Sequence, residues 1–151
     1  MLAEAGIGAV GVDSDAGMVA RCRAKGHEST VLGDGVVHLE GLDDASLGLV
    51  FSAQVIEHMP PDVLKRFLAL AARKLRPGGL LVAETVNPHS AAALKAFWVD
   101  ITHQHPLFPE TMLALCRIAG FDAAYVFHPN GAGDIEADRF TTGEYAVVAR
   151  R

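Results

Sequence analysis

Three polar side chains with the spacing of one helix face follow a short apolar segment of the sequence. Gln54, Glu57 and His58 stand at positions i, i+3 and i+4, just after the strand-like segment Leu47–Ser52. A helical turn here places all three on one face, near the carboxyl end of that strand. Ligands of open α/β sheets bind at this end of the strands. The spacing therefore predicts a binding site with His58 on the substrate side; a purely structural turn is the alternative.

A glycine pattern near the start of the chain matches a phosphate-binding loop in its letters. Gly6-Ile7-Gly8-Ala9-Val10-Gly11 has the form Gly-x-Gly-x-x-Gly. In dinucleotide-binding proteins that loop follows a strand and opens a helix, whose N-terminus receives the pyrophosphate. Here too few residues precede the pattern and a strand is expected after it. We therefore predict that Gly6 ends a helix and that Gly8 and Gly11 lie in or beside a strand.

The elements that position these residues alternate between strands and helices along most of the chain. A strand over Gly8–Asp13 ends in an acid, and Ser14 is an N-cap candidate for a helix that runs to about Lys25. The apolar run Leu80–Val86 is typical of a parallel-sheet strand covered on both faces. The other expected elements are strands over Glu28–Leu32 and Leu47–Ser52, a polar connection from Gly33 through Asp44, a helix that begins after Pro60-Pro61-Asp62 and is stopped by Pro77-Gly78-Gly79, and helices over His89–Trp98 and Pro109–Ala119.

The C-terminal part follows a different pattern. Strand-like segments over Ala123–His128 and Tyr145–Ala149 are separated by the polar, glycine-containing Pro129–Gly143, in which we expect no helix. Two successive strands without a crossover are antiparallel. The sequence therefore predicts one α/β domain over residues 1–151, with a mainly parallel sheet and a C-terminal antiparallel hairpin.

Composition and charge exclude several classes of protein. Half of the 151 residues are hydrophobic and 21% are charged, which is typical of a compact domain with a core. The net charge of −5 provides no field that attracts nucleic acid or anionic membranes. Apolar stretches are shorter than the roughly 20 residues of a membrane span, and no secretion signal is evident, so we expect a cytoplasmic protein. Cys22 and Cys116 lack metal-site spacing, and we expect both in the core.

Four motifs, in order, resemble those of the class I S-adenosylmethionine-dependent methyltransferases. They are Gly11-Val12-Asp13, Gly33-Asp34-Gly35, the segment from Phe51 to Met59, and Leu75-Arg76-Pro77-Gly78-Gly79-Leu80-Leu81. Each motif alone is weak, but together with the expected strands and the antiparallel hairpin they cover nearly the whole chain. The resemblance implies a Rossmann-like methyltransferase fold and S-adenosyl-L-methionine as the cofactor.

The resemblance also implies which residues bind that cofactor. Asp13 matches the acid that accepts hydrogen bonds from the two ribose hydroxyls. Asp34 matches the residue that accepts a hydrogen bond from the adenine amino group, while its two successors flank the ring. The expected cofactor-binding residues are Asp13, Ser14, Asp34, Gly35, Val36 and Gln54. The alternatives are an acid that stabilises a helix N-terminus for Asp13 and an ordinary turn for Asp34.

A further segment, Phe97–Glu110, resembles a loop of bacterial methyltransferases associated with glycans and other sugar-bearing products. Such loops lie over the methyl group of the cofactor, where His103 or Asp100 can accept the proton of an acceptor hydroxyl. We take His103 and His58 as the catalytic candidates. A histidine that anchors the loop to backbone is the alternative.

No metal is expected at either histidine-containing segment. In some relatives, acidic residues and the histidine of the segment Gln54–His58 hold a divalent metal, but glutamine occupies the first position here. A site made of His103 and His105 needs further ligands that the sequence does not identify. We therefore predict that the site works without a metal.

The start of the chain departs from the family pattern. The family begins with a central strand and a glycine-rich loop, whereas Met1–Ile7 resembles only the end of the helix that follows them. Without that strand, backbone groups stay unpaired between Gly8–Asp13 and Leu47–Ser52. Three explanations stay open: a truncated chain, a strand supplied by a second copy in an obligate homodimer, or a rearranged sheet that binds the cofactor poorly.

The resemblance implies methyl transfer to a small-molecule or sugar-containing acceptor, at oxygen. A methyltransferase-like module without catalysis, serving binding or assembly, and a truncated fragment are the competing hypotheses. A nicotinamide-dependent oxidoreductase is weaker, because no catalytic Tyr/Lys pattern follows and the glycine pattern is misplaced.

Overall fold

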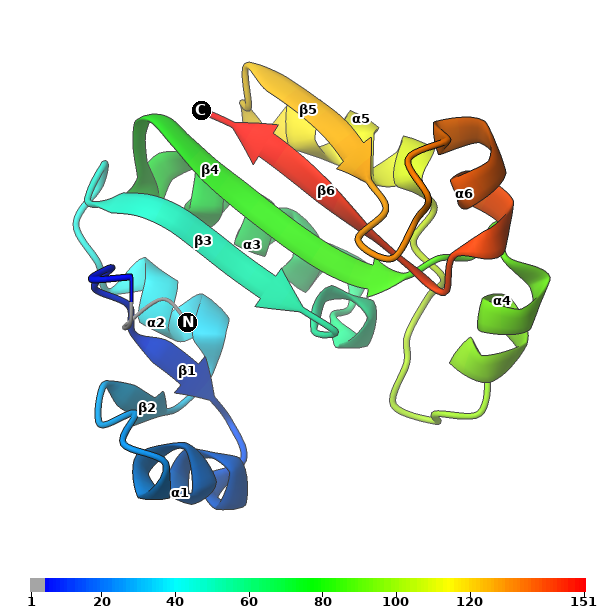
Figure 1. The fold of residues 1–151 in the computed structure, drawn as a ribbon. Coiled ribbons are helices and arrows are strands. Elements are labelled where there is room, and N and C mark those ends of the chain that lie inside the picture. Colours follow the sequence, from blue (N-terminus) through cyan, green and yellow to red (C-terminus); the bar gives the residue numbers. More distant parts are fainter. Residues whose placement is uncertain (1–4) are drawn as a thin grey trace. The chain divides into compact units, whose positions relative to one another are not determined.

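The computed structural model describes residues 5–151, which form two compact units. Unit 1 ends at Leu42, and unit 2 comprises Asp43–Arg151. Each unit has its own sheet, and the strands are labelled in Figure 1. No helix of the described residues is long and apolar enough to cross a membrane.

Unit 1 is built on two short parallel strands. Strand β1 (Gly11–Asp13) pairs with β2 (Thr30–Leu32), with Asp13 opposite Leu32. Both strands are shorter than predicted. Because β1 begins at Gly11, the glycine pattern precedes a strand and opens no helix, as predicted. The helix end expected before this pattern falls largely on residues 1–4, which lie outside the described residues.

A helix follows each of these strands, and both helices differ from what the sequence predicted. Helix α1 (Ala16–Ala24) is capped by Asp15 and not by Ser14, because the Asp15 side chain accepts a hydrogen bond from the Met18 amide at 2.9 Å. Helix α2 (Gly35–Glu40) stands where a polar connection was expected. It is too short to show a helical period in the sequence, and its strongest signal is the cap residue before it.

Unit 2 contains a four-stranded sheet in the order β3-β4-β6-β5. Strands β3 (Leu47–Ala53) and β4 (Leu75–Val86) are parallel, and β6 (Glu144–Arg150) runs antiparallel to both β4 and β5 (Ala123–Phe127). The mixed sheet with a reversed last strand is confirmed. Among the described strands, β1 pairs only with β2, and β3 pairs only with β4. That the first strand of the family is missing stays a prediction.

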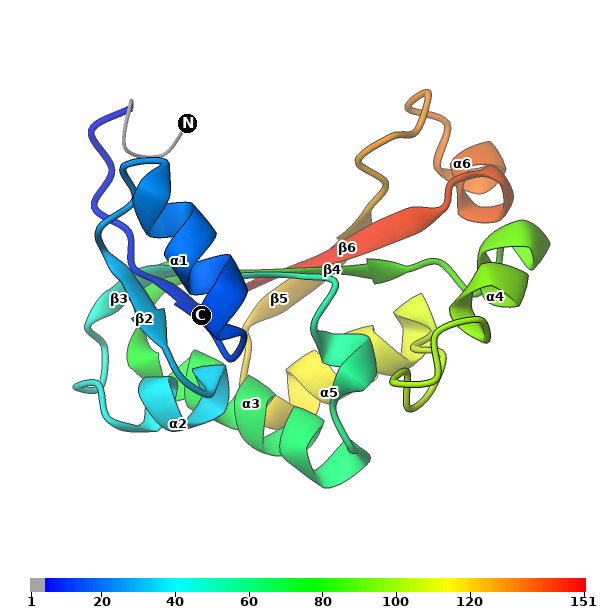
Figure 2. The ribbon, with the colours of Figure 1, turned by 90° about the horizontal axis from the view of Figure 1, so that it is seen from below.

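Two amphipathic helices cover one face of this sheet (Figure 2). Helix α3 (Pro61–Lys74) begins with proline at its first turn and buries an apolar face, and α5 (Pro109–Ala119) packs beside it. The predicted bounds of α5 are confirmed, and Gly120 after it has φ 97°, a left-handed conformation that favours glycine. The core between helices and sheet includes Leu68, Leu81, Met112, Tyr145 and Val147.

No separate turn lies between α3 and β4, although one was expected there. Helix α3 ends at Lys74 and β4 starts at Leu75, so Pro77-Gly78-Gly79 lies inside the strand and does not stop the helix. The Arg151 guanidinium donates to the carbonyls of Arg73, at 2.8 Å, and of Leu75, which satisfies the end of the helix.

The segment between β5 and β6 contains a helix that the sequence analysis excluded. Helix α6 (Ile135–Thr141) is capped by Asp134. Its buried Asp138 accepts hydrogen bonds from the amides of Ala132 and Gly133 at 2.8 and 2.9 Å. Polar capping by these two aspartates, and not an apolar period, holds this helix in place.

Candidate functional site

Two carboxylates stand at the carboxyl ends of the parallel strands of unit 1. Asp13 is the last residue of β1, and its Oδ1 accepts a hydrogen bond from the Asp15 amide at 2.8 Å. The Gly33 amide donates to the Asp13 carbonyl at 2.9 Å, which places Asp34 next to the end of β1. Asp34 Oδ1 caps α2 through the amides of Val36 and Val37, at 2.8 and 2.9 Å. The Oδ2 atoms of both acids accept no hydrogen bond from the residues that the structure describes.

The other expected cofactor residues of unit 1 differ in exposure. Ser14 is exposed in the turn after β1, and Gly35 is the exposed first residue of α2, where helix amides lack an intrahelical acceptor. The Val36 side chain is buried, whereas the neighbouring Val37 and Leu32 side chains are exposed. The apolar surface beside Asp34 is therefore provided by Leu32 and Val37, which the sequence analysis did not select.

In unit 2, the turn after β3 differs from the expected α-helical face. A single 3-10 turn, η1, covers Ile56–His58, and Gln54 lies before it with φ 54°. The Gln54 amide donates to the Glu84 carbonyl at 3.0 Å, and its side-chain Nε2 lies 3.5 Å from the Glu84 carboxylate. Gln54 is thus held against β4, so the three residues do not share one helix face.

The tertiary structure instead joins η1 to the loop after α4 (Ala91–Phe97). The imidazole rings of His58 and His103 lie 4.7 Å apart between centroids, and His103 is stacked on the Phe97 ring at 4.3 Å. The Gln104 amide donates to the Glu57 carbonyl at 2.8 Å, which fixes the loop against η1. Both catalytic candidates therefore belong to one cluster.

The hydrogen bonds of this cluster determine where each imidazole carries its proton. The Nδ1 atom of His103 lies 2.7 Å from the Phe97 carbonyl oxygen, and a carbonyl only accepts, so Nδ1 is the protonated nitrogen. The Thr102 hydroxyl donates to Asp100 Oδ1 at 2.6 Å, so its oxygen accepts from His58 Nδ1 at 2.9 Å. In the neutral rings, both Nε2 atoms consequently present a lone pair.

Asp100 is held in its ionised form by the same network. The hydroxyl and the amide of Thr102 both donate to its Oδ1, and these hydrogen bonds lower the pKa of Asp100 below the usual value. The Asp100 Oδ2 atom lies 3.9 Å from His103 Nε2. An anchored histidine at position 103, which the sequence analysis kept as the alternative, is thus observed, and the anchoring leaves Nε2 free for chemistry.

Glu57 is the residue of the cluster that the sequence analysis left without a role. Its side chain is 1% exposed, and neither carboxylate oxygen has a hydrogen-bond partner among the described residues. Buried carboxylates are ordinarily paired or hydrogen-bonded. Thr102 was also not selected, although it orients His58; its only sequence signal is its place directly before His103. His105 lies outside the cluster of Glu57, His58 and His103.

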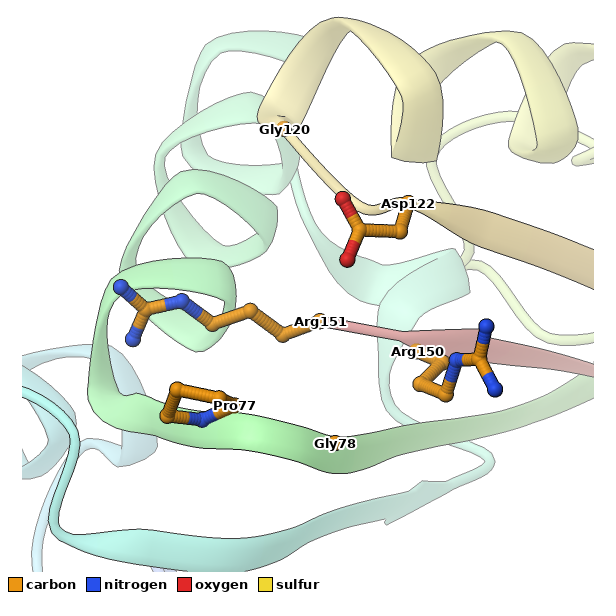
Figure 3. A pocket seen from close by; sticks show the side chains of 6 residues that line it. All are labelled: Pro77, Gly78, Gly120, Asp122, Arg150 and Arg151. Carbon is orange, nitrogen blue, oxygen red and sulfur yellow. The ribbon is translucent and has the colours of Figure 1, made fainter.

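A separate pocket lies at the other end of β4. It is lined by Pro77, Gly78, Gly120, Asp122, Arg150 and Arg151, as Figure 3 shows. The Arg151 side chain there is engaged with the end of α3. The histidine cluster instead follows the carboxyl end of β3, where sites of parallel sheets are found. We therefore place the candidate site of unit 2 at the cluster and not at the pocket.

Comparison with known proteins shows the family of the chain. Residues 1–83 match the family described as "Methyltransferase domain". A "Probable S-adenosylmethionine-dependent methyltransferase" of Mycolicibacterium smegmatis is 30% identical over 131 residues, which are 85% of this chain and 50% of that protein. A "Probable methyltransferase" of Aspergillus luteorubrus is 30% identical over 138 residues, covering 76% of this chain and 48% of that protein. The chain thus spans about half the length of the curated relatives that it matches.

Solved structures share the fold. The crystal structure of a SAM dependent methyltransferase from Archaeoglobus fulgidus matches with a TM-score of 0.86 and 26% identity, over 99% of this chain and 79% of that one. An S-adenosylmethionine dependent methyltransferase from Mesorhizobium loti matches with a TM-score of 0.69 and 23% identity, over 94% of this chain and 79% of that one. The cofactor of the family is S-adenosylmethionine, as predicted. The chain belongs to the methyltransferase domain family, within the class I S-adenosylmethionine-dependent methyltransferases.

Proposed function

We propose that this chain carries S-adenosylmethionine-dependent methyl transfer to an oxygen of a small-molecule or sugar-containing acceptor. The observation that supports it most is the pair of carboxylates Asp13 and Asp34 at the ends of adjacent parallel strands, each with one oxygen free to accept hydrogen bonds. The histidine cluster of unit 2 provides the groups that an acceptor hydroxyl needs.

The residues of unit 1 fit the nucleoside part of the cofactor. A ribose diol donates two hydrogen bonds, and Asp13 has an oriented carboxylate at a strand end to accept them. The adenine amino group needs an acceptor, which Asp34 Oδ2 provides while Oδ1 keeps capping α2. Leu32 and Val37 supply exposed apolar surface for the ring. When bound, the cofactor supplies the methyl group on a sulfonium, and the protein supplies binding and orientation.

In unit 2, His103 is the group that we assign to the acceptor. Its Nδ1 proton is committed to the Phe97 carbonyl, so Nε2 can accept the proton of a hydroxyl that attacks the methyl carbon. His58 is oriented by Thr102 in the same way and presents a second basic nitrogen. Asp100 is ionised and stabilises a protonated His103 through the 3.9 Å contact.

The first test is calorimetric binding of S-adenosylhomocysteine to the purified chain. We expect saturable binding that Asp13→Ala weakens by more than about ten-fold, because a hydrogen-bonded charge contributes on the order of 1.5–3 kcal/mol. The matched control is Glu28→Ala, which removes an exposed acid of unit 1 that takes no part in the proposed site. A folded chain that does not bind S-adenosylhomocysteine, or an Asp13→Ala variant that binds like wild type, contradicts the proposal and favours a non-catalytic module or a fragment.

A further inference from the structure

We propose that Glu57, His58 and His103 bind one divalent transition-metal ion. One ligand atom from each of these residues lies within 4.8 Å of the ligand atoms of the other two. The set combines two imidazoles with one carboxylate, which suits zinc, manganese, iron(II) or cobalt(II). No metal was predicted from the sequence, because glutamine stands at position 54 and no further ligands could be assigned to His103 and His105.

The first argument is the state of Glu57. A carboxylate that is 1% exposed, with no hydrogen bond from any described residue to either oxygen, is costly unless a cation accompanies it. No described lysine or arginine forms an ion pair with Glu57. The polar side chains that cluster with it are the imidazoles of His58 and His103. A bound dication supplies the missing partner.

The second argument is the orientation of the imidazoles. A metal-binding histidine typically donates its other ring N–H to a carbonyl or a carboxylate-linked group, which fixes the tautomer. His103 Nδ1 donates to the Phe97 carbonyl at 2.7 Å, and His58 Nδ1 donates to Thr102, which donates in turn to Asp100. Both Nε2 atoms are therefore available to bind an ion without a change of tautomer.

The third argument is charge and distance. Two acidic side chains stand at the cluster, Glu57 as one of its members and Asp100 with its Oδ2 3.9 Å from His103 Nε2. Ligand atoms around a tetrahedral ion at about 2.0–2.1 Å are about 3.3 Å apart. The observed separations of up to 4.8 Å therefore have to shrink by up to about 1.5 Å. Side-chain rotations of Glu57 and His58 have to supply this movement, because His103 is anchored to the Phe97 carbonyl.

The proposed ion has a chemical consequence for the site. Three protein ligands leave at least one position open for water or for an oxygen of the acceptor. A hydroxyl bound there loses its proton at a lower pH than a free hydroxyl. In the metal-bound chain His103 Nε2 is a ligand and the proton of the bound hydroxyl passes to water, whereas in the metal-free chain Nε2 accepts that proton as proposed above. Metal binding itself does not depend on the proposed methyl transfer, because it is measured without cofactor or acceptor.

The experiment is a titration of the untagged, chelator-treated chain with cobalt(II), followed by its visible absorption and by calorimetry. A histidine tag is removed because it binds cobalt itself. We expect one ion per chain, and at least about ten-fold weaker binding in Glu57→Gln, His58→Ala and His103→Ala. Thr102→Val, which removes only the group that orients His58, should weaken binding by about 10- to 100-fold. His105→Ala is the matched control from the same loop and should bind as wild type.

Circular dichroism shows whether each variant is folded, and Glu57→Gln is nearly isosteric with the natural residue. A folded wild-type chain that takes up no cobalt overturns the proposal. Uptake that survives unchanged in folded Glu57→Gln and His103→Ala also overturns it. S-adenosylhomocysteine binding, measured on the same metal-free preparation, reports on the proposed function separately.

Discussion

The Nδ1 atom of His103 donates its proton to the carbonyl oxygen of Phe97 at 2.7 Å. This contact orients the ring and leaves Nε2 as its basic nitrogen, whether that nitrogen binds a proton or an ion. Because Phe97 is the last residue of α4 and its ring also stacks on the imidazole, the helix end positions His103.

Replacing His103 with alanine should reduce methyl transfer without a matching loss of cofactor affinity. General base catalysis contributes about 10²- to 10⁴-fold, so we expect turnover to fall within that range while the dissociation constant of S-adenosylhomocysteine changes little. Release of S-adenosylhomocysteine in the presence of hydroxyl acceptors measures turnover. Unchanged turnover in the variant removes His103 from the mechanism.

The roles of the two carboxylate oxygens of Asp34 can be separated by substitution. Asp34→Ser keeps a good N-cap for α2 but removes the oxygen that we assign to the adenine amino group. We therefore expect weaker S-adenosylhomocysteine binding, by about ten-fold, with an unchanged melting temperature. Asp34→Ala loses the cap as well and should lower both quantities. If Asp34→Ser binds as wild type, the residue serves only as a helix cap.

Tyr145 ties the sheet to the loop that carries His103. Its side chain is fully buried, and its hydroxyl donates to the Leu107 carbonyl at 2.7 Å; burial raises the pKa of Tyr145 well above its usual value. Tyr145→Phe removes only this hydrogen bond, so we expect a loss of about 1 kcal/mol in the free energy of unfolding. Urea denaturation measures it, and equal midpoints and slopes for the two proteins would show that the bond contributes nothing.

The two cysteines should differ in reactivity. Burial raises the pKa of the Cys116 thiol to about 11, whereas Cys22 is only half-buried. At pH 8 a thiol with that pKa has on the order of 100-fold less thiolate than an ordinary cysteine. We expect iodoacetamide to label Cys22 in the folded chain and Cys116 only after unfolding. The Cys22→Ser variant tests this directly, since rapid labelling of its folded form contradicts the expectation.

Acid should weaken unit 2 through Asp44. The hydrogen bond from the buried Lys74 ammonium, at 2.8 Å, is the main cause of the lowered pKa of Asp44, and the Lys74 and Arg73 charges add to it. A lowered folded-state pKa stabilises the fold above the unfolded pKa, and this contribution is lost as pH falls through the folded one. Asp44→Asn should therefore be less stable than wild type at neutral pH, and the difference should vanish in acid. Thermal melts from pH 7 to pH 3 measure this; a constant difference would contradict it.

Local patterns in the sequence determined most of the regular elements. The proline at the first turn of Pro109–Ala119 and the glycine that follows it predicted α5 at its observed bounds, because these signals act at the helix ends themselves. The short helices Gly35–Glu40 and Ile135–Thr141 were missed, because they depend on capping by Asp34 and Asp134 more than on an apolar face. The cap of α1 is Asp15, one residue after the predicted Ser14. Serine and aspartate are both good caps, so the sequence does not distinguish between two adjacent ones.

The sequence by itself determined the fold family and gave candidates for the site, since motif order and strand-ending acids are properties of the chain. Only the tertiary structure decided how those residues combine. The Gln54 side chain lies against Glu84. The Glu57 side chain is buried and clusters with His103, which is far from it in the sequence. Such contacts form because the loop after α4 packs against the turn after β3. The residue pattern of neither segment predicts that packing.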